Sequence, residues 1–375
     1  MATSYSPKII TDGLVFMYDT DDGKSYKGEP TTNLNTFTLS DSGTDGSGQS
    51  SVGTRTVITD NYVRIVDVAS NTRQTHVITG LTASTTYTVS IMYKKLVGTP
   101  TFRFQIQDYS GSSYLRTIKF TNTSEIGIQD KEGWQLASWT FTLGSDANAV
   151  RVWYQDGADY TTYTHSFELQ NPQLEAKSHA TQFVNGTRSV TEGLLDLTNN
   201  ATINLSNVSF DSNAQMVLDG TDDTINTGLF SGRNPATDPF TIEAVVKSNT
   251  TSGNRMWVDA TNNGTNQRLY CAYAATGTGN PMGIQGSGWS SSGVNDTDYH
   301  HYIIVMDGSV ARLYNNGEAH STRNYTSYQI QALNIGGRNS YRWLGDIPIF
   351  KLYNRALTAA EVLQNFNATK SRFGL

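Results

Sequence analysis

The chain of 375 residues contains one cysteine, Cys271, so an intramolecular disulfide and a cysteine-rich zinc site are both excluded. Charged residues make up only 16% of the sequence, against about 25% in typical soluble domains, but an aromatic content of 11% argues against intrinsic disorder. The formal net charge of -6 argues against a nucleic-acid-binding protein that relies on a basic surface. No apolar run approaches the ~18 residues of a membrane-spanning helix, so we expect no membrane insertion.

Signatures of secretion and catalysis are also missing. Residues 1–13 lack the basic and then apolar layout of a secretory signal, and no Gly-x-Ser-x-Gly motif of a serine hydrolase occurs. Glycoside hydrolysis needs two carboxylates about 5–9 Å apart, yet no strand pattern carries alternating acidic residues. Glu243 stands alone in its strand pattern, and we interpret it as a solvent-facing side chain. The sequence therefore predicts a protein that is not an enzyme.

Strand patterns run along almost the whole chain. Residues 87–93 and 240–247 place apolar side chains on one face with a period of two, and residues 302–306 are apolar throughout. Asp307-Gly308 and the Asn-Asn-Gly run at 315–317 follow such strands. They predict tight hairpin turns, because Gly and Asn tolerate positive φ.

Helix signals are confined to the C-terminus. Thr358 and Glu361 have the spacing of a capping box, in which each side chain bonds to the other residue's backbone amide. The apolar residues that follow recur at the spacing of one helix face: Ala359, Val362, Leu363 and Phe366. The sequence therefore predicts an all-β protein of two β-sandwich (jelly-roll) domains with one short C-terminal helix.

Several stretches resemble the laminin-G-like, concanavalin A-like jelly roll that recurs in bacteriophage structural proteins. The most specific of them are the strand FTIEAVVK and the stretch that ends in YNRALT. The stretches that resemble this family are residues 12–19, 23–26, 218–223, 240–247 and 343–358.

The first of these stretches is separated from the later ones by a long segment with strand patterns of its own. We interpret residues 31–188 as a β-sandwich, similar to carbohydrate-binding modules, that is inserted into the jelly roll. Residues 1–30 would form an N-terminal arm and the first strand of the jelly roll, and residues 189–375 the rest of it. The alternative is two consecutive domains, with residues 8–30 as an arm.

Aromatic residues in or near polar loops are candidate sugar-binding residues. Flat rings can stack on the C–H faces of sugars, while amides and carboxylates bond to the hydroxyl groups. The candidates are Trp257, Tyr270, Tyr273 and Trp289 in the second half of the chain, and Tyr154, Tyr160 and Tyr163 in the insert. The alternative interpretation is that these rings belong to a core or an interface, as most aromatic residues of sandwiches do.

Asp219, Asp222 and Asp223 are candidate ligands of a metal ion. Calcium prefers several carboxylate and carbonyl oxygens, and many laminin-G-like domains bind calcium at one rim of the sandwich. The alternative is a turn in which Asp side chains accept hydrogen bonds from backbone amides. Calcium is the one cofactor that the sequence suggests.

The resemblance implies a bacteriophage virion surface protein that is assembled in the host cytoplasm. It would act as a tail-fibre or spike-type adhesin, with host surface polysaccharide and other virion proteins as partners. We expect a homo-oligomer, and specifically a trimer, because fibres and spikes are commonly threefold. A capsid decoration or head-fibre protein with a structural role is the alternative, and a carbohydrate-active enzyme is the third interpretation.

Overall fold

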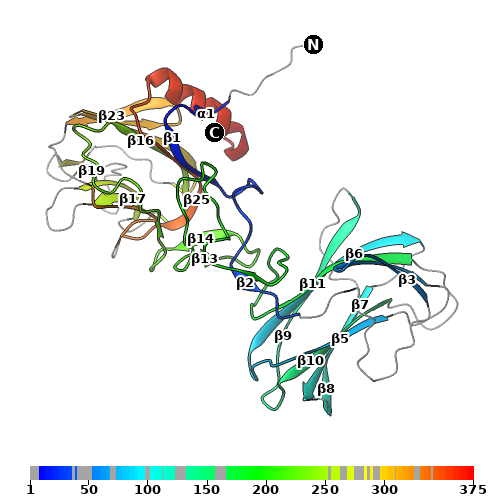
Figure 1. Ribbon diagram of the computed structural model, residues 1–375. Coiled ribbons are helices and arrows are strands. Elements are labelled where there is room, and N and C mark those ends of the chain that lie inside the picture. The colour runs from blue at the N-terminus through cyan, green and yellow to red at the C-terminus, as the bar shows by residue number, and fades with distance from the viewer. Residues whose placement is uncertain are drawn as a thin grey trace, which may run out of the picture. The chain divides into compact units, whose positions relative to one another are not determined.

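The chain forms two compact units in a computed structural model (Figure 1). Unit 1 comprises residues 1–30, 189–211 and 215–375, and unit 2 comprises residues 31–188 and 212–214. The structure describes these residues: 8–35, 39, 53–67, 73–97, 102–111, 113–122, 132–156, 166–251, 255–261, 268–273, 283–284, 288–289, 296–308, 310–324, 330–338 and 341–375.

Unit 1 is a sandwich of two antiparallel sheets. The first sheet has eight strands, seven of which follow one another in space, and β1 (Leu14–Asp19) also pairs with β25. In spatial order the seven are β13 (Ser209–Phe210), β14 (Met216–Asp219), β25 (Leu344–Tyr353), β16 (Phe240–Ser248), β21 (Tyr299–Asp307), β22 (Val310–Asn315) and β23 (Glu318–Asn324). The second sheet has six: β15 (Ile225–Asn226), β24 (Ala332–Ile335), β17 (Arg255–Thr261), β18 (Arg268–Tyr273), β19 (Gly283–Ile284) and β20 (Gly288–Trp289).

The hydrophobic core of unit 1 lies between these two sheets. Alternate residues of β16, such as Ile242 and Ala244, meet Val258 and Ala260 of β17 in one buried cluster. Full burial of a large apolar side chain contributes about 1.5–3 kcal/mol, so this cluster dominates the stability of the sandwich. The hairpins at Gly308 (φ 65°) and Gly317 (φ 79°) connect β21 to β22 and β22 to β23, which confirms both predicted turns.

Helix α1 (Ala359–Phe373) lies against the outer face of the eight-stranded sheet (Figure 1). The predicted capping box is present, since the Thr358 side chain accepts from the Glu361 amide and the Glu361 side chain accepts from the Thr358 amide. The predicted apolar face is only partly right. Val362 is buried, but Leu363 is 48% exposed, and the polar residues Asn365 and Thr369 are buried instead.

The solvent-facing position predicted for Glu243 is wrong. Glu243 does point away from the core between the sheets, but α1 covers that side, and the residue is 0% exposed. The strand period shows which residues share a face, and it does not show whether a helix from elsewhere in the chain covers the face.

Unit 2 is also a sandwich. Its five-stranded sheet contains, in spatial order, β3 (Gly53–Thr59), β4 (Tyr62–Asp67), β11 (Ser166–Glu175), β6 (Thr86–Val97) and β9 (Trp134–Thr142). Its four-stranded sheet contains β5 (Arg73–Thr79), β10 (Ala149–Asp156), β7 (Phe102–Ser110) and β8 (Ser113–Asn122). Alternate apolar residues of both sheets, among them Val89, Ile91, Val150 and Val152, form its core.

A short ladder joins the two ends of unit 2. Strand β2 (Thr31–Thr32) pairs with β12 (Thr187–Arg188), so the chain enters and leaves this unit at adjacent strands. The all-β fold class with one C-terminal helix is therefore confirmed for the described part of the chain. Among the described residues, no helix has both the length and the apolar character needed to cross a bilayer.

Candidate functional site

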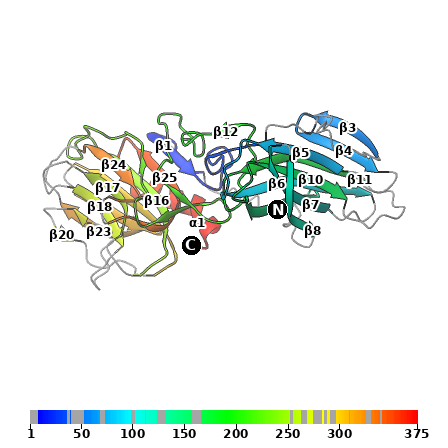
Figure 2. The same ribbon diagram turned by 90° about the horizontal axis from the view of Figure 1, so that it is seen from below.

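The outward face of the six-stranded sheet of unit 1 carries the candidate site. Ile225, Ile335 and Val258 form one cross-strand row, and all three belong to the core. The next row along the strands therefore faces away from the core, because successive residues of a strand point to opposite sides. Figure 2 shows β24, β17 and β18 side by side in this sheet.

This outward row has one member from each of the six strands, and all but one of them are polar or aromatic. Its members are consecutive Cα partners in the sheet, and directly opposed residues of an antiparallel sheet share a face. From β15 to β20 they are Asn226, Asn334, Asp259, Tyr270, Gly283 and Trp289. The amides of Asn226 and Asn334 at one end and aromatic residues at the other are of the types that bind sugar hydroxyls and sugar C–H faces.

The members of the row differ in exposure. Asn226 is exposed, Asn334 is half-buried and Asp259 is fully buried. Gly283 is the Cα partner of Tyr270 on β18 and of Trp289 on β20.

Two of the seven predicted aromatic residues thus lie in one row, whereas Tyr273, Tyr154 and Trp257 do not join them. Tyr273 lies on β18 opposite Arg255, and Tyr154 lies on β10 of unit 2, opposite Gln74 and Phe104. Tyr160 and Tyr163 lie outside the described residues.

The prediction of Trp257 as a sugar-binding residue is contradicted by its burial. Its side chain is 1% exposed and stacks on Tyr302, with ring centroids 6.1 Å apart and planes 10° apart. The register of β17 against β18 shifts between Met256 and Val258, which marks a β-bulge at Trp257. Because of this bulge, the consecutive residues Trp257 and Val258 both contribute to the core.

The three predicted metal ligands do come together. One carboxylate oxygen from each of Asp219, Asp222 and Asp223 lies within 4.8 Å of the others, so the cluster could hold a metal ion. Asp223 is 1% exposed, and burial raises the pKa of its carboxyl group. Its Oδ1 accepts from the Ser209 amide at 2.9 Å, and its Oδ2 accepts from the Asp219 amide. The turn is therefore held by Asp223 itself, and calcium stays a prediction.

Replacement of Asp223 by Ala is expected to lower the free energy of unfolding by about 1–3 kcal/mol, because the Ser209 and Asp219 amides lose the buried carboxylate that accepts from them. Replacement of the exposed Asp222 by Ala is the matched control and should change it by less than about 0.5 kcal/mol without calcium. Thermal unfolding of each variant with calcium and with a chelator measures both effects. A calcium-dependent rise in Tm that Asp222→Ala abolishes would support the site, and an identical wild-type Tm in both conditions would contradict it.

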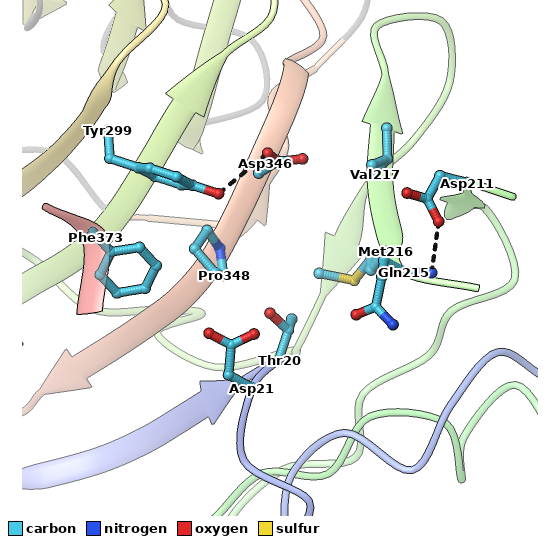
Figure 3. Close-up of a pocket in the computed structure, with 10 residues that line it drawn as sticks. All are labelled: Thr20, Asp21, Asp211, Gln215, Met216, Val217, Tyr299, Asp346, Pro348 and Phe373. Carbon is cyan, nitrogen blue, oxygen red and sulfur yellow. Dashed lines mark hydrogen bonds between the residues drawn. The ribbon is translucent and has the colours of Figure 1, made fainter. Parts of the chain in front are cut away.

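Unit 1 also has a small acidic pocket (Figure 3). Its volume is about 230 Å³, and Asp21, Asp211 and Asp346 line it. Tyr299 donates to Asp346 at 3.5 Å, the Gln215 backbone N–H donates to Asp211 at 3.0 Å, and Arg372 donates to Asp21 at 2.8 Å. The pocket is smaller than the roughly 300–1,000 Å³ of typical small-molecule sites, and these carboxylates already have partners. We therefore place the candidate site on the sheet face.

The chain matches one family model over part of its length. Residues 219–363 match Laminin_G_3, described as the concanavalin A-like lectin/glucanases superfamily. Unit 1 therefore contains a concanavalin A-like jelly-roll domain, as the sequence predicted. The chain has no match among curated proteins.

Several solved structures are weakly similar to this chain, and their names refer to sialidases, an arabinanase or a bound sugar. The Trypanosoma rangeli sialidase is 13% identical over 68% of this chain and 46% of its own, with a TM-score of 0.40. Domain 4 of AbnA, a GH43 extracellular arabinanase from Geobacillus stearothermophilus in complex with arabinotriose, is 16% identical over 47% of this chain and 92% of its own, with a TM-score of 0.37. The CBM40 of a Ruminococcus gnavus IT-sialidase bound to alpha2,3 sialyllactose is 13% identical over 37% and 94%, with a TM-score of 0.28.

The chain thus spans less than half of the sialidase that it resembles. Similarity at this level carries no information about what this chain binds.

Proposed function

We propose that this protein binds glycans through the outward face of the six-stranded sheet of unit 1. The observation that carries the proposal is the cross-strand row that runs from Asn226 and Asn334 through Asp259 to Tyr270 and Trp289. A polar end that bonds to hydroxyl groups and an aromatic end that stacks on pyranose faces would suit an extended sugar chain lying across the strands. The concanavalin A-like lectin description of the matching family supports the same class of ligand.

In this proposal the protein binds and does not hydrolyse its ligand. Hydrolysis by the usual mechanism needs a pair of carboxylates on the two sides of the scissile bond. Among the described residues of the six strands, Asp259 is the single acidic residue. Asp259 is 0% exposed, so the described strands of this sheet do not offer a ligand the pair of carboxylates that hydrolysis requires.

The finer proposal follows from the resemblance in the sequence. We place the protein on the surface of a virion assembled in the host cytoplasm, as a tail-fibre or spike-type adhesin for host surface polysaccharide. Homo-oligomers, with a trimer as the expected form, would bind several copies of the glycan at once, and linked sites raise the overall affinity by 10²–10⁴ without new contacts. A capsid decoration or head-fibre protein would instead bind virion proteins and need no sugar.

Replacement of Tyr270 or Trp289 by Ala is expected to weaken glycan binding about tenfold or more. An aromatic residue at the centre of an interface contributes about 2 kcal/mol or more, and 1.4 kcal/mol corresponds to a factor of ten. The measurement is binding of the purified protein, in multivalent form, to a glycan array and then by titration to the best sugar. Release of reducing sugar in the same samples tests for hydrolysis.

The matched control is Tyr114→Ala, which removes a 53% exposed tyrosine from unit 2. It should leave binding unchanged. Absence of binding to every sugar and to host cells would overturn the glycan proposal and favour the decoration role, whereas binding that survives both unit 1 substitutions would move the site elsewhere.

A further inference from the structure

A buried polar cluster lies between helix α1 and the eight-stranded sheet of unit 1. Glu243 of β16 and Lys351 of β25 are direct cross-strand partners, and Asn365 of α1 lies over them. The three residues are 0%, 1% and 0% exposed, in that order. A lysine, a carboxylate and an amide are thus held together in a place that solvent does not reach.

One carboxylate contacts both the amine and the amide. Lys351 Nζ donates to Glu243 Oε1 at 2.5 Å, and Asn365 Nδ2 donates to Glu243 Oε2 at 2.6 Å. The two oxygens of a carboxylate are close together, so the lysine nitrogen and the side-chain amide lie beside the same group. That group can accept a proton from one of them and return it to the other.

Further hydrogen bonds hold both polar atoms of the Asn365 side-chain amide in place. Asn365 Nδ2 also donates to the Tyr353 hydroxyl at 2.9 Å. Asn365 Oδ1 accepts from the Ile10 backbone amide at 2.7 Å. A backbone N–H aimed at this oxygen would stabilise the negative charge that develops there when a nucleophile adds to the amide carbon.

We propose that Lys351 and Asn365 join through an intramolecular isopeptide bond, with Glu243 as the proton carrier and Ile10 N–H as the oxyanion donor. Lys351 Nζ first gives a proton to Glu243. The neutral amine then adds to Asn365 Cγ, forming the Nζ–Cγ bond and placing negative charge on Oδ1. Glu243 passes protons from Nζ to Nδ2, the Cγ–Nδ2 bond breaks, and ammonia leaves. The sum is an amine plus a primary amide giving a secondary amide plus ammonia, and no oxidant or cofactor takes part.

Proton transfer between Lys351 and Glu243 is the uphill first step. Burial by itself would raise the pKa of Glu243, but Lys351 and His301 lower it to about 2, so the ion pair is the resting form. After transfer both groups are neutral, and the burial of Glu243 and Lys351 favours neutral forms. The fixed geometry compensates for a slow proton step, because a held amine and amide react as one molecule.

The bond would tie α1 to β25 covalently, and it would form without any ligand. The bond would therefore increase the stability of unit 1, and its formation does not depend on glycan binding. A protein that has few charges and no disulfide within its chain would gain a permanent cross-link by this route.

The test is the mass of the intact, purified protein and of its tryptic peptides. We expect a mass below that of the sequence by one ammonia molecule. Lys351 should resist trypsin, and the peptide of residues 343–355 should appear joined to the peptide of residues 356–370. Asn365→Ala keeps the Lys351–Glu243 pair and should have the full mass calculated for its sequence, whereas Asn367→Ala, two residues along the same helix, should keep the cross-link.

Two results would overturn the proposal. One is a folded wild-type protein of full mass in which the two peptides separate. The other is loss of one ammonia with unlinked peptides, which would identify a cyclised asparagine or glutamine elsewhere. Circular dichroism of each variant shows whether it is folded, and the wild-type digest decides the question even if a variant is not.

Discussion

Replacement of Glu243 by Gln is expected to lower the free energy of unfolding of unit 1 by about 3–5 kcal/mol, because it leaves the Lys351 ammonium buried without its carboxylate. His301 Nε2, 2.9 Å from Glu243 Oε1, loses the same partner. The substitution also removes the proton carrier of the isopeptide reaction, so the variant should keep the full mass calculated for its sequence. Urea unfolding measures the stability, and hydrogen exchange of the α1 peptides locates the loss.

A double substitution distinguishes the effect of the buried charges from the effect of side-chain shape. Glu243→Gln combined with Lys351→Met removes both charges and should recover part of the lost stability, since a buried pair replaced by groups of similar size is often neutral or better. Glu318→Gln, at an exposed position on β23, should change stability by less than about 0.5 kcal/mol. If Glu243→Gln lowered the free energy of unfolding as little as Glu318→Gln, the buried pair would not hold α1 in place.

The local elements of unit 1 could be predicted because short-range chemistry determines them. The capping box of Thr358 and Glu361 involves residues three apart, and the turns at Gly308 and Gly317 need only a residue that accepts positive φ. The strand of residues 240–247 has an apolar residue at every second position from Phe240 to Val246, so its period was readable without any knowledge of its neighbours. The all-β class follows from many such elements and little helix signal.

The buried cluster could not be predicted, because it depends on contacts that are distant in sequence. Glu243 meets Lys351 108 positions later, and Asn365 reaches both only after α1 has folded back over the sheet. A polar residue in the helical stripe, Asn365 between Val362 and Phe366, was the one available signal. Its residue type gives no indication of burial, yet Asn365 is part of the buried contact.

The alignment of the sugar-binding candidates could not be predicted either, because it depends on the register between strands. Tyr270 and Trp289 could be selected by residue type, but their place in one row depends on the pairing of β18, β19 and β20. The polar half of the row, Asn334 and Asp259, was missed because each stands alone in its strand. Only the register aligns them.

Trp257 is expected to matter for stability and to be irrelevant to sugar binding. Replacement by Ala removes a fully buried ring that contacts Tyr302 and Phe350, and large-to-small changes of this kind lower the free energy of unfolding by about 3–5 kcal/mol. Trp257→Phe keeps part of the volume and should lose less. The measurement is urea unfolding of both variants beside the wild type.

Glycan titration of the same variants distinguishes a core residue from a contact residue. Under conditions in which Trp257→Phe is folded, its affinity should equal that of the wild type, whereas Tyr270→Ala should lose affinity while keeping its stability. The difference follows from position, because the bulge in β17 turns Trp257 toward the core while the row of Tyr270 faces outward. A folded Trp257→Phe protein with tenfold weaker binding would mean that the sugar reaches the core side of the sheet, which a 1% exposed ring does not permit.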